Sequence, residues 1–411
     1  MKASEDRVGR GGRQAANGHS AFRWVSKGAL AVAAVLVVAA AAVSFGGQAP
    51  GGQKVQQERL GKLHGDARAF AFGYATALPF SRATGFVFSE DGCHLAYAMN
   101  LGDMFQGDKW IVVVDGQSGP EYDGTEGIVF SPDGGRVAYA ARKGGKWTVV
   151  VDGKPGPEYD GIDVGLGGGL VFSPDGKRVA YSAVKSDKRS VVVDDQAGPG
   201  YEAVLDIVFS RNGKRVAYSA ATATEWPEKW LVVVDGQPGP EYDRVARALF
   251  SPDGKRVAYG AMKGDKCLVV VDGQPGPEYD DTGGLLFSPD GKRVAYGASK
   301  GDKWFVVVDG RAGPEHDGLG GIPDVSIVFS PDGKRIAYAA KEAGKRFVVV
   351  DGRRGRPYDW TDDIIFSPDG KRVAHAASHG GKSFVVVDRR AGPEYEKALD
   401  IVFSPDGKRL A

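Results

Sequence analysis

The amino-acid sequence predicts an all-β protein built from tandem repeats of about 40 residues. The phrase Phe-Ser-Pro-Asp-Gly, with small variations, occurs nine times from Phe88 to Phe403, at spacings of 42, 42, 37, 41, 37, 42, 37 and 37 residues. A period of this length is typical of architectures in which each unit completes its core only against its neighbours. No helical periodicity follows residue 46. We therefore expect strands throughout the repeats.

Each unit contains four strand-like segments, as the unit around Phe250 illustrates. Its expected strands lie at residues 249–250, 256–259, 268–272 and 273–280. Pro252 presets the first dihedral angle of the intervening turn, and Gly254 tolerates the positive φ that closes a hairpin. Ser-Pro-Asp-Gly therefore predicts a tight turn between the first two strands. The Lys-Arg pair that follows this turn is expected to keep the strand edges soluble, and the alternative is that an acidic partner uses it.

The third and fourth segments of the unit differ in character. The run from Val269 to Val271 is β-branched and uninterrupted, which is typical of a strand buried on both faces between neighbouring sheets. Pro275 and Pro277 can occupy only a turn or a sheet edge. The fourth strand is therefore expected at the outer rim.

The longest form of the repeated phrase, Phe-Ser-Pro-Asp-Gly-Lys-Arg-Val-Ala-Tyr, is intact at residues 172–181, 250–259 and 287–296. It resembles the WD40-like β-propeller repeat of the TolB type, and the resemblance covers residues 86–411. The resemblance implies four-stranded blades around a channel. The Gly-His and Trp-Asp dipeptides of true WD40 repeats are absent from these units. Their structural hydrogen-bond network is therefore not expected here.

The number of blades depends on how the two ends of the repeat region are used. Eight units are complete, and the ninth stops at Ala411 after two expected strands. Propellers usually remove such an open edge by pairing the two chain ends in one blade. Residues 69–74 alternate like a third strand, and residues 78–85 occupy the place of a fourth. We therefore expect a single propeller of either eight or nine blades, the ninth being composite.

The N-terminal region has a different character from the repeats. Residues 29–45 form an uncharged run of 17, preceded by six Lys or Arg residues and two acidic residues. This pattern predicts one transmembrane helix at residues 28–46, with the basic segment 1–27 in the cytoplasm. The alternative is a cleaved secretory signal, but Pro50 follows the candidate cleavage site and disfavours cleavage there.

The remaining domain boundaries follow from this anchor. Residues 47–65 are rich in Gly and Gln and predict a flexible stalk. Residues 66–411 then form the propeller. In this interpretation the chain is a single-pass membrane protein whose propeller lies outside the cytoplasm, in the periplasm or at the cell surface.

Composition and residue spacing exclude several partners and sites. Lys plus Arg (53) nearly equals Asp plus Glu (52), for a net charge of +1, so no nucleic-acid partner is expected. Cys93 and Cys267 stand at unrelated positions of different units, which suits neither a metal site nor a disulfide. We expect no metal and no cofactor. One aspartate recurs after the fourth strand and is expected to cap turns, not to bind calcium: Asp123, Asp160, Asp243, Asp280, Asp317 and Asp359.

Two of the four connections in each unit vary in length. The distance from the Phe to the second-strand Tyr is always 9, and that from the third-strand Asp to the fourth-strand Tyr is always 7, with His375 and His316 each replacing a Tyr once. The other two distances are normally 13 and 8, but the four exceptions are 18 (Tyr97 to Asp115), 17 (Tyr218 to Asp235), 13 (Tyr159 to Phe172) and 13 (His316 to Phe329). Since both variable connections emerge on one face of a propeller blade, all four insertions are expected on that face.

The four insertions contain apolar and aromatic residues with glycines nearby. We interpret seven of these residues as candidate binding residues: Met104, Phe105, Leu166, Trp226, Pro227, Leu319 and Ile322. Loops on a rigid repeat scaffold carry recognition, and exposed apolar side chains suit an interaction surface. The expected ligand is a protein or an extracellular polymer. The alternative is that the insertions accumulated on one face by drift.

Two segments match catalytic motifs in part, but neither has the flanking residues or the helix that its motif requires. Residues 297–301 match the nucleophile-elbow pattern but precede a strand instead of a helix. Residues 380–383 resemble the end of a phosphate loop, but Ala376 stands at the position of its first glycine. The sequence therefore predicts a membrane-anchored, non-enzymatic scaffold. The alternative is a propeller hydrolase or lyase whose residues converge at the channel mouth from several blades, and blade-unique polar residues clustered there would favour it.

Overall fold

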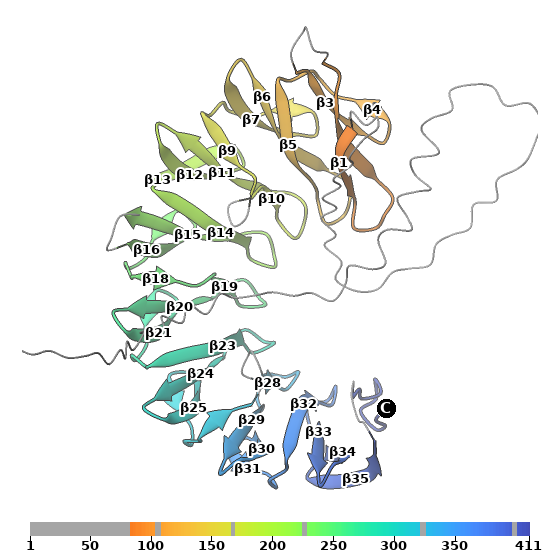
Figure 1. Ribbon diagram of the computed structural model, residues 1–411, viewed down its shortest axis with the longest axis vertical. Coiled ribbons are helices and arrows are strands. Elements are labelled where there is room, and N and C mark those ends of the chain that lie inside the picture. Colours follow the sequence, from red (N-terminus) through yellow and green to blue (C-terminus); the bar gives the residue numbers. More distant parts are fainter. Residues whose placement is uncertain (1–82, 103–107, 166–168, 224–227, 321–325, 397–400) are drawn as a thin grey trace, which may run out of the picture. The chain divides into compact units, whose positions relative to one another are not determined.

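The computed structural model describes residues 83–411, except 103–107, 166–168, 224–227, 321–325 and 397–400. These residues contain 35 strands in eight antiparallel sheets and no helix (Figure 1). In three sheets the first strand is divided into two pieces, so every sheet has four strand positions in chain order. We number the sheets 1 to 8 along the chain.

The strand bounds follow the repeat closely. First strands are β1 (Ala83–Phe88), β5 (Gly124–Phe130), β9 (Gly161–Asp163) with β10 (Val171–Phe172), β14 (Ala203–Phe209), β18 (Arg244–Val245) with β19 (Leu249–Phe250), β23 (Asp281–Phe287), β27 (Gly318–Leu319) with β28 (Ile327–Phe329), and β32 (Trp360–Phe366). Second strands are β2 (Leu95–Asn100), β6 (Val137–Lys143), β11 (Val179–Lys185), β15 (Val216–Ala223), β20 (Val257–Lys263), β24 (Val294–Lys300), β29 (Ile336–Glu342) and β33 (Val373–His379).

The third strands are uniform and the fourth are short. Third strands are β3 (Trp110–Val114), β7 (Lys146–Val151), β12 (Lys188–Val193), β16 (Lys229–Val234), β21 (Lys266–Val271), β25 (Lys303–Val308), β30 (Lys345–Val350) and β34 (Lys382–Val387). Fourth strands are β4 (Gln117–Ser118), β8 (Lys154–Pro155), β13 (Gln196–Tyr201), β17 (Gln237–Pro238), β22 (Gln274–Pro275), β26 (Arg311–Ala312), β31 (Arg353–Arg354) and β35 (Arg390–Tyr395).

The hydrophobic core lies between consecutive sheets. Val270 of β21 packs with Ala217 and Val232 of sheet 4, whereas the next residue back, Val269, packs with Val294 and Tyr296 of sheet 6. Successive strand residues point to opposite faces, so one run of valines contributes to two cores. This confirms that the third strand is buried on both faces and that each unit completes its core against its neighbours.

The Ser-Pro-Asp-Gly turn forms as expected and also contacts the preceding sheet. Gly254 has a φ of +72°, and its N–H donates to the carbonyl of Ser251 at 2.8 Å. The buried Ser251 hydroxyl accepts from Arg256 N–H at 2.9 Å and donates to Asp253 at 2.6 Å. A Cβ at Gly254 would lie 2.7 Å from the Asn212 side chain of sheet 4. Glycine is therefore required for its backbone angle and for this close approach.

Four-stranded antiparallel sheets that pack in succession are the blades of a β-propeller, and the predicted fold is confirmed with eight blades in the described residues. The ninth phrase forms a hairpin, in which Phe403 pairs with Leu410. Residues 83–85, the described part of the expected donor segment 78–85, belong to β1 of sheet 1. The segment 69–74, the expected membrane anchor 28–46 and the stalk 47–65 lie outside the described residues. Within residues 83–411, as far as they are described, no helix is long and apolar enough to cross a membrane.

An arginine clamp joins each sheet to the next at the Ser-Pro-Asp-Gly turns. Arg256 of sheet 5 donates from Nε to Asp272 at 2.8 Å and from a terminal nitrogen to the carbonyl of Lys292 in sheet 6. Its guanidinium carbon also lies 5.6 Å from the centre of the Phe287 ring. The same set recurs for Arg136, Arg178, Arg215, Arg293, Arg335 and Arg372.

Sheet 1 has a variant of this clamp. His94 occupies the arginine position, with Nδ1 2.7 Å from Asp115, and its ring centre lies 6.3 Å from that of Phe130 in sheet 2. The hydrogen bond to Asp115 raises the pKa of His94. The arginine of the Lys-Arg pair therefore has a role that the sequence did not predict, because its side chain links two sheets.

Replacing Arg256 with Ala is expected to lower the free energy of unfolding by about 1–2 kcal/mol, because charge-assisted hydrogen bonds are lost. The value is modest because the Arg256 side chain is 31% exposed and solvent screens its charge. Denaturant unfolding followed by fluorescence measures the change. The matched control is Lys255→Ala, because the Lys255 side chain is 82% exposed; its expected effect is below about 0.5 kcal/mol. Equal losses in the two variants would contradict the clamp.

Candidate functional site

The strand register places both variable connections at one end of each sheet. In sheet 2, Gly124 pairs with Arg142 and Lys143 pairs with Lys146, so the start of the first strand lies beside the connection between the second and third strands. Phe130 pairs with Val137 and Val151 with Lys154 at the opposite end. We call the former the insertion end and the latter the turn end. The two longer insertions, in sheets 1 and 4, therefore emerge at the insertion end, where Asn100 pairs with Trp110 and Ala223 with Lys229. The expectation is wrong for the insertions of sheets 3 and 7, because their added residues lie inside the first strand, between β9 and β10 and between β27 and β28, and not at its start.

One of the seven candidate binding residues lies within the described residues. Leu319 pairs with Ala340 in sheet 7, is half-buried, and packs against a core that includes Phe329 and Phe347. The other six lie outside the described residues: Met104, Phe105, Leu166, Trp226, Pro227 and Ile322. Their interpretation as a binding surface stays a prediction.

The recurrent aspartates at the insertion end cap turns, as expected. Asp280 accepts from Lys266 Nζ at 2.7 Å, within its own sheet, and from the backbone N–H of Gly301 at 2.6 Å, in the next sheet. These hydrogen bonds hold the pKa of Asp280 below its usual value. The equivalent backbone contact occurs at Asp123, Asp160, Asp243, Asp317 and Asp359. Among the residues that the structure describes, no group of His, Cys, Asp and Glu is arranged to hold a metal ion.

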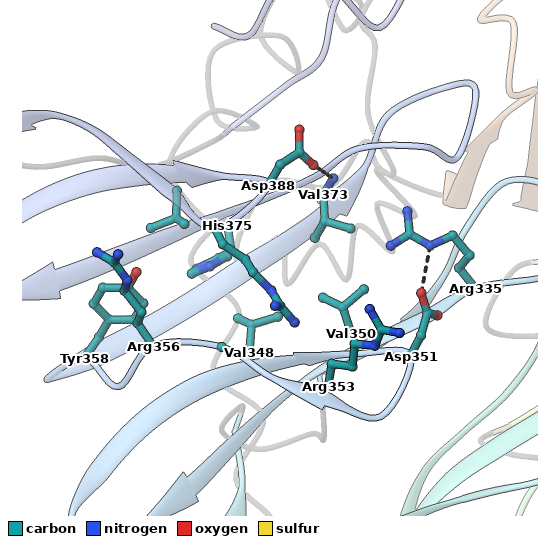
Figure 2. Close-up of a pocket in the computed structure, with 13 residues that line it drawn as sticks. Arg335, Val348, Val350, Asp351, Arg353, Arg356, Tyr358, Val373, His375 and Asp388 are labelled. Atoms are coloured by element: carbon teal, nitrogen blue, oxygen red, sulfur yellow. Dashed lines mark hydrogen bonds and ion pairs between the residues drawn. The ribbon is translucent and has the colours of Figure 1, made fainter.

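Two cavities lie at equivalent places at the turn end, between consecutive sheets. The larger, of about 500 Å³, lies between sheets 7 and 8 (Figure 2), and the smaller, of about 320 Å³, lies between sheets 1 and 2. In each case the turn after the third strand of one sheet faces the second strand of the next. The equivalence identifies this place as a recurring gap between blades whose size and polarity depend on local substitutions.

The larger cavity coincides with a shortened side chain, because His375 replaces a tyrosine. In sheets 2, 4, 5, 6 and 7 the tyrosine hydroxyl reaches the turn of the preceding sheet; a Cβ built on Gly239, for example, would lie 3.2 Å from Tyr259 Oη. Imidazole is shorter than phenol, and His375 and the equivalent turn glycine, Gly355, both line the cavity. The substitution leaves space where the phenol would otherwise lie.

The imidazole of His375 is neutral near pH 7. It is 7% exposed, and burial lowers its pKa to about 4. Thr361 Oγ1 donates to the carbonyl of Ala376 at 2.7 Å and lies 2.7 Å from His375 Nδ1. Because the hydroxyl has one proton, Nδ1 is the donor in the second contact and Nε2 is left as an acceptor. A residue lining the cavity thus offers a neutral hydrogen-bond acceptor.

Arginines rim this cavity. Arg335, Asp351 and Arg353 lie at one side of it, and Arg356, Tyr358 and His375 lie at the other (Figure 2). Sequence reasoning identified His375 as a substitution but missed the arginines. The signal was present: Arg356 stands where every other complete unit has proline. A comparison of equivalent positions across the units identifies Arg356 as a substitution. That Arg356 and His375 line the same cavity depends on how sheets 7 and 8 pack, which the comparison does not show.

No protein-family model matches the chain, and no curated protein sequence matches it. Similar solved structures include the β-propeller domain of the Trilobed protease from Pyrococcus furiosus, at 15% identity over 68% of this chain and 96% of that chain, with a TM-score of 0.33. TolB from Acinetobacter baumannii is 15% identical over 61% of each chain, with a TM-score of 0.25. A puromycin hydrolase is 16% identical over 70% of this chain and 57% of that chain, with a TM-score of 0.29. The blade assignment rests on the sheet topology, and these similarities assign no activity.

Replacing His375 with Tyr is expected to narrow the cavity and to reduce the acid sensitivity of the folded protein. The pKa of this imidazole is about 4 in the folded protein, against an ordinary value of 6.5, so the unfolded chain binds the proton more readily between these pH values. Stability is therefore lost as the pH falls from about 6.5 to about 4, by up to about 3 kcal/mol. Unfolding curves at pH 7 and pH 4 measure the difference, which is expected to shrink in His375→Tyr.

The companion variant His316→Tyr is expected to act in the same direction, because burial also lowers the pKa of His316. A pH dependence of stability that is unchanged in His375→Tyr would show that the imidazole is not the group that titrates.

Proposed function

We propose that the protein is a non-enzymatic β-propeller scaffold that binds a protein or an extracellular polymer at the insertion end of its blades. The observation that carries this proposal is the shared location of the two longest insertions. They occur in sheets 1 and 4, in the connection between the second and third strands, and the strand register brings both to the same end. Loops on a rigid scaffold are a common place for recognition.

The use of the repeated polar residues also supports a scaffold. Arg256 and Asp272 hold consecutive sheets at the turn end, Asp280 caps a turn at the insertion end, and Ser251 is bonded inside its own turn. These residues recur because every blade needs the same contacts. Their recurrence therefore has a structural cause that requires no chemistry on a substrate.

The N-terminal sequence supports attachment to a membrane. The uncharged run at residues 29–45 and its basic flank favour one transmembrane helix at residues 28–46, with the blades outside the cytoplasm. A scaffold in this position meets proteins and polymers of the cell envelope or surface. This is the class of ligand proposed here.

Shortening the two longest connections tests the binding proposal. Residues 100–108 and 221–228 are trimmed by five and four residues, which gives both the usual distance of 13. Since six complete units already have this length, the variant is expected to unfold at the temperature of the full chain. Recovery of cross-linked partners from solubilised membranes is expected to fall at least tenfold. A control variant carries Lys255→Ala and Lys292→Ala at the turn end, and recovery equal in all three proteins would contradict the proposal.

Deleting residues 28–46 tests the attachment. Because residues 29–45 are the proposed membrane-spanning run, the shortened chain is expected in the soluble fraction after alkaline washing, whereas the full chain stays with the membranes. Immunoblotting of the two fractions measures the ratio. A full chain that is released by the same wash would contradict a transmembrane anchor.

A further inference from the structure

In the turns that follow the third strands of sheets 7 and 8, several residues of the repeat are replaced by arginine. The segment after the third strand reads Asp-Gly-Gln-Pro-Gly-Pro-Glu-Tyr in sheets 4 and 5, Asp-Gly-Arg-Arg-Gly-Arg-Pro-Tyr in sheet 7, and Asp-Arg-Arg-Ala-Gly-Pro-Glu-Tyr in sheet 8. Sheet 7 also loses the glutamate of this segment, because Pro357 replaces it. The position of Arg353 is also basic in sheets 2 and 6, at Lys154 and Arg311, but no other complete unit has a basic residue at the positions of Arg356 and Arg389. The cavity between the two sheets is therefore bordered by more positive charge than the equivalent places of the other blades.

Arg389 occupies a backbone position that favours glycine. Its φ is +69°, and six of the other seven complete units have glycine there, with φ between +74° and +79°; the seventh has Asp195 at +64°. Side chains with a Cβ rarely adopt this conformation. A long charged residue held in a strained conformation beside a cavity suggests a function that offsets the strain.

The arginines of this cavity are not neutralised by the residues around them. Its lining includes four arginines (335, 353, 356 and 389) and two aspartates (351 and 388), which gives a net charge of +2. Arg335 pairs with Asp351 at 2.8 Å, and Asp388 pairs with Arg372 at 3.0 Å. Within the described part of the chain, Arg353, Arg356 and Arg389 have no acidic partner within 4.0 Å.

The interior of the cavity complements this charged rim. Val348, Val350, Val373 and Val386 supply apolar surface, and His375 supplies a neutral acceptor. A volume of about 500 Å³ is suited to a small molecule. Planar guanidinium groups bind phosphate or carboxylate oxygens in pairs.

We propose that the cavity between sheets 7 and 8 binds a small organic anion that carries at least two negative charges on phosphate or carboxylate groups. The charged groups contact Arg353, Arg356 and Arg389, and the organic part lies against the valines. This site is at the turn end, so it is separate from the binding proposed at the insertion end. The equivalent cavity between sheets 1 and 2 is lined by Gln117, Ser118, Tyr139 and Gly153 with no arginine, and it does not bind such a ligand.

The test uses the full chain and reverts the three arginines to residues of other units, as Arg353→Gln, Arg356→Pro and Arg389→Gly. Each replacement is already used at the same position of another blade, so the variant is expected to fold. Citrate and fructose 1,6-bisphosphate are the carboxylate and phosphate probes, and inorganic phosphate and chloride at equal ionic strength are the controls. Calorimetric titration and thermal unfolding measure binding.

The expected result is saturable binding of at least one organic probe to the unmodified chain, weakened at least tenfold in the triple variant. A second variant, His375→Tyr, keeps all three arginines but narrows the cavity, as at the equivalent cavity lined by Tyr139, and it is expected to weaken binding by a similar factor. Arg389→Gly alone is expected to weaken binding while raising the unfolding temperature. Affinity that is unchanged in the triple variant or in His375→Tyr, or a response that follows ionic strength only, would overturn the proposal.

Discussion

The rest of the structure depends on the arginine clamp at the turn end. Each clamp arginine binds an aspartate of its own sheet and a backbone carbonyl of the next sheet, and it lies over the phenylalanine that begins the next unit. The repeated phrase therefore supplies both sides of the contact. Since the apolar cores also lie between sheets, polar and hydrophobic contacts act at the same junctions. A single blade therefore lacks most of the contacts that stabilise it in the full chain.

The different contacts at the turn end and at the insertion end explain where the blades can vary in sequence and in length. At the turn end, a one-residue change between Phe250 and Tyr259 would displace Arg256 from Asp272 and Lys292, which explains the constant distance of 9. The constant distance of 7 keeps the backbone hydrogen bonds from Gly276 to Val269 and from Tyr279 to Cys267. At the insertion end, the aspartate that follows the fourth strand binds a backbone N–H of the next sheet, and the connection between the second and third strands changes in length in sheets 1 and 4. Departures at the turn end take the form of substitutions, as at His375 and Arg389, whereas added residues occur at the insertion end and within the first strands of sheets 3 and 7.

Local sequence predicted the features that follow from the type and position of a residue in its unit. They are the positive φ of Gly254, the two-sided burial of Val269 and Val270, and the capping role of Asp280, although the partners of these valines and of Asp280 lie in neighbouring sheets. The clamp was missed because Arg256 and its carbonyl partner Lys292 are 36 residues apart and in different sheets. The cavity was missed for the same reason, since its walls come from two units. Met104 and Trp226, predicted from loop length, lie outside the described residues, so their surface is proposed from the strand register alone.

The most direct test of the account is a double-mutant cycle between Arg256 and Phe287, which belong to consecutive sheets. The single variants Arg256→Ala and Phe287→Leu and their combination are compared by denaturant unfolding of the full chain. If the arginine joins the sheets, the two changes are coupled by about 1 kcal/mol. Strictly additive losses would contradict the account, because the contact between the arginine and the ring of the next sheet would then contribute nothing to holding the two sheets together.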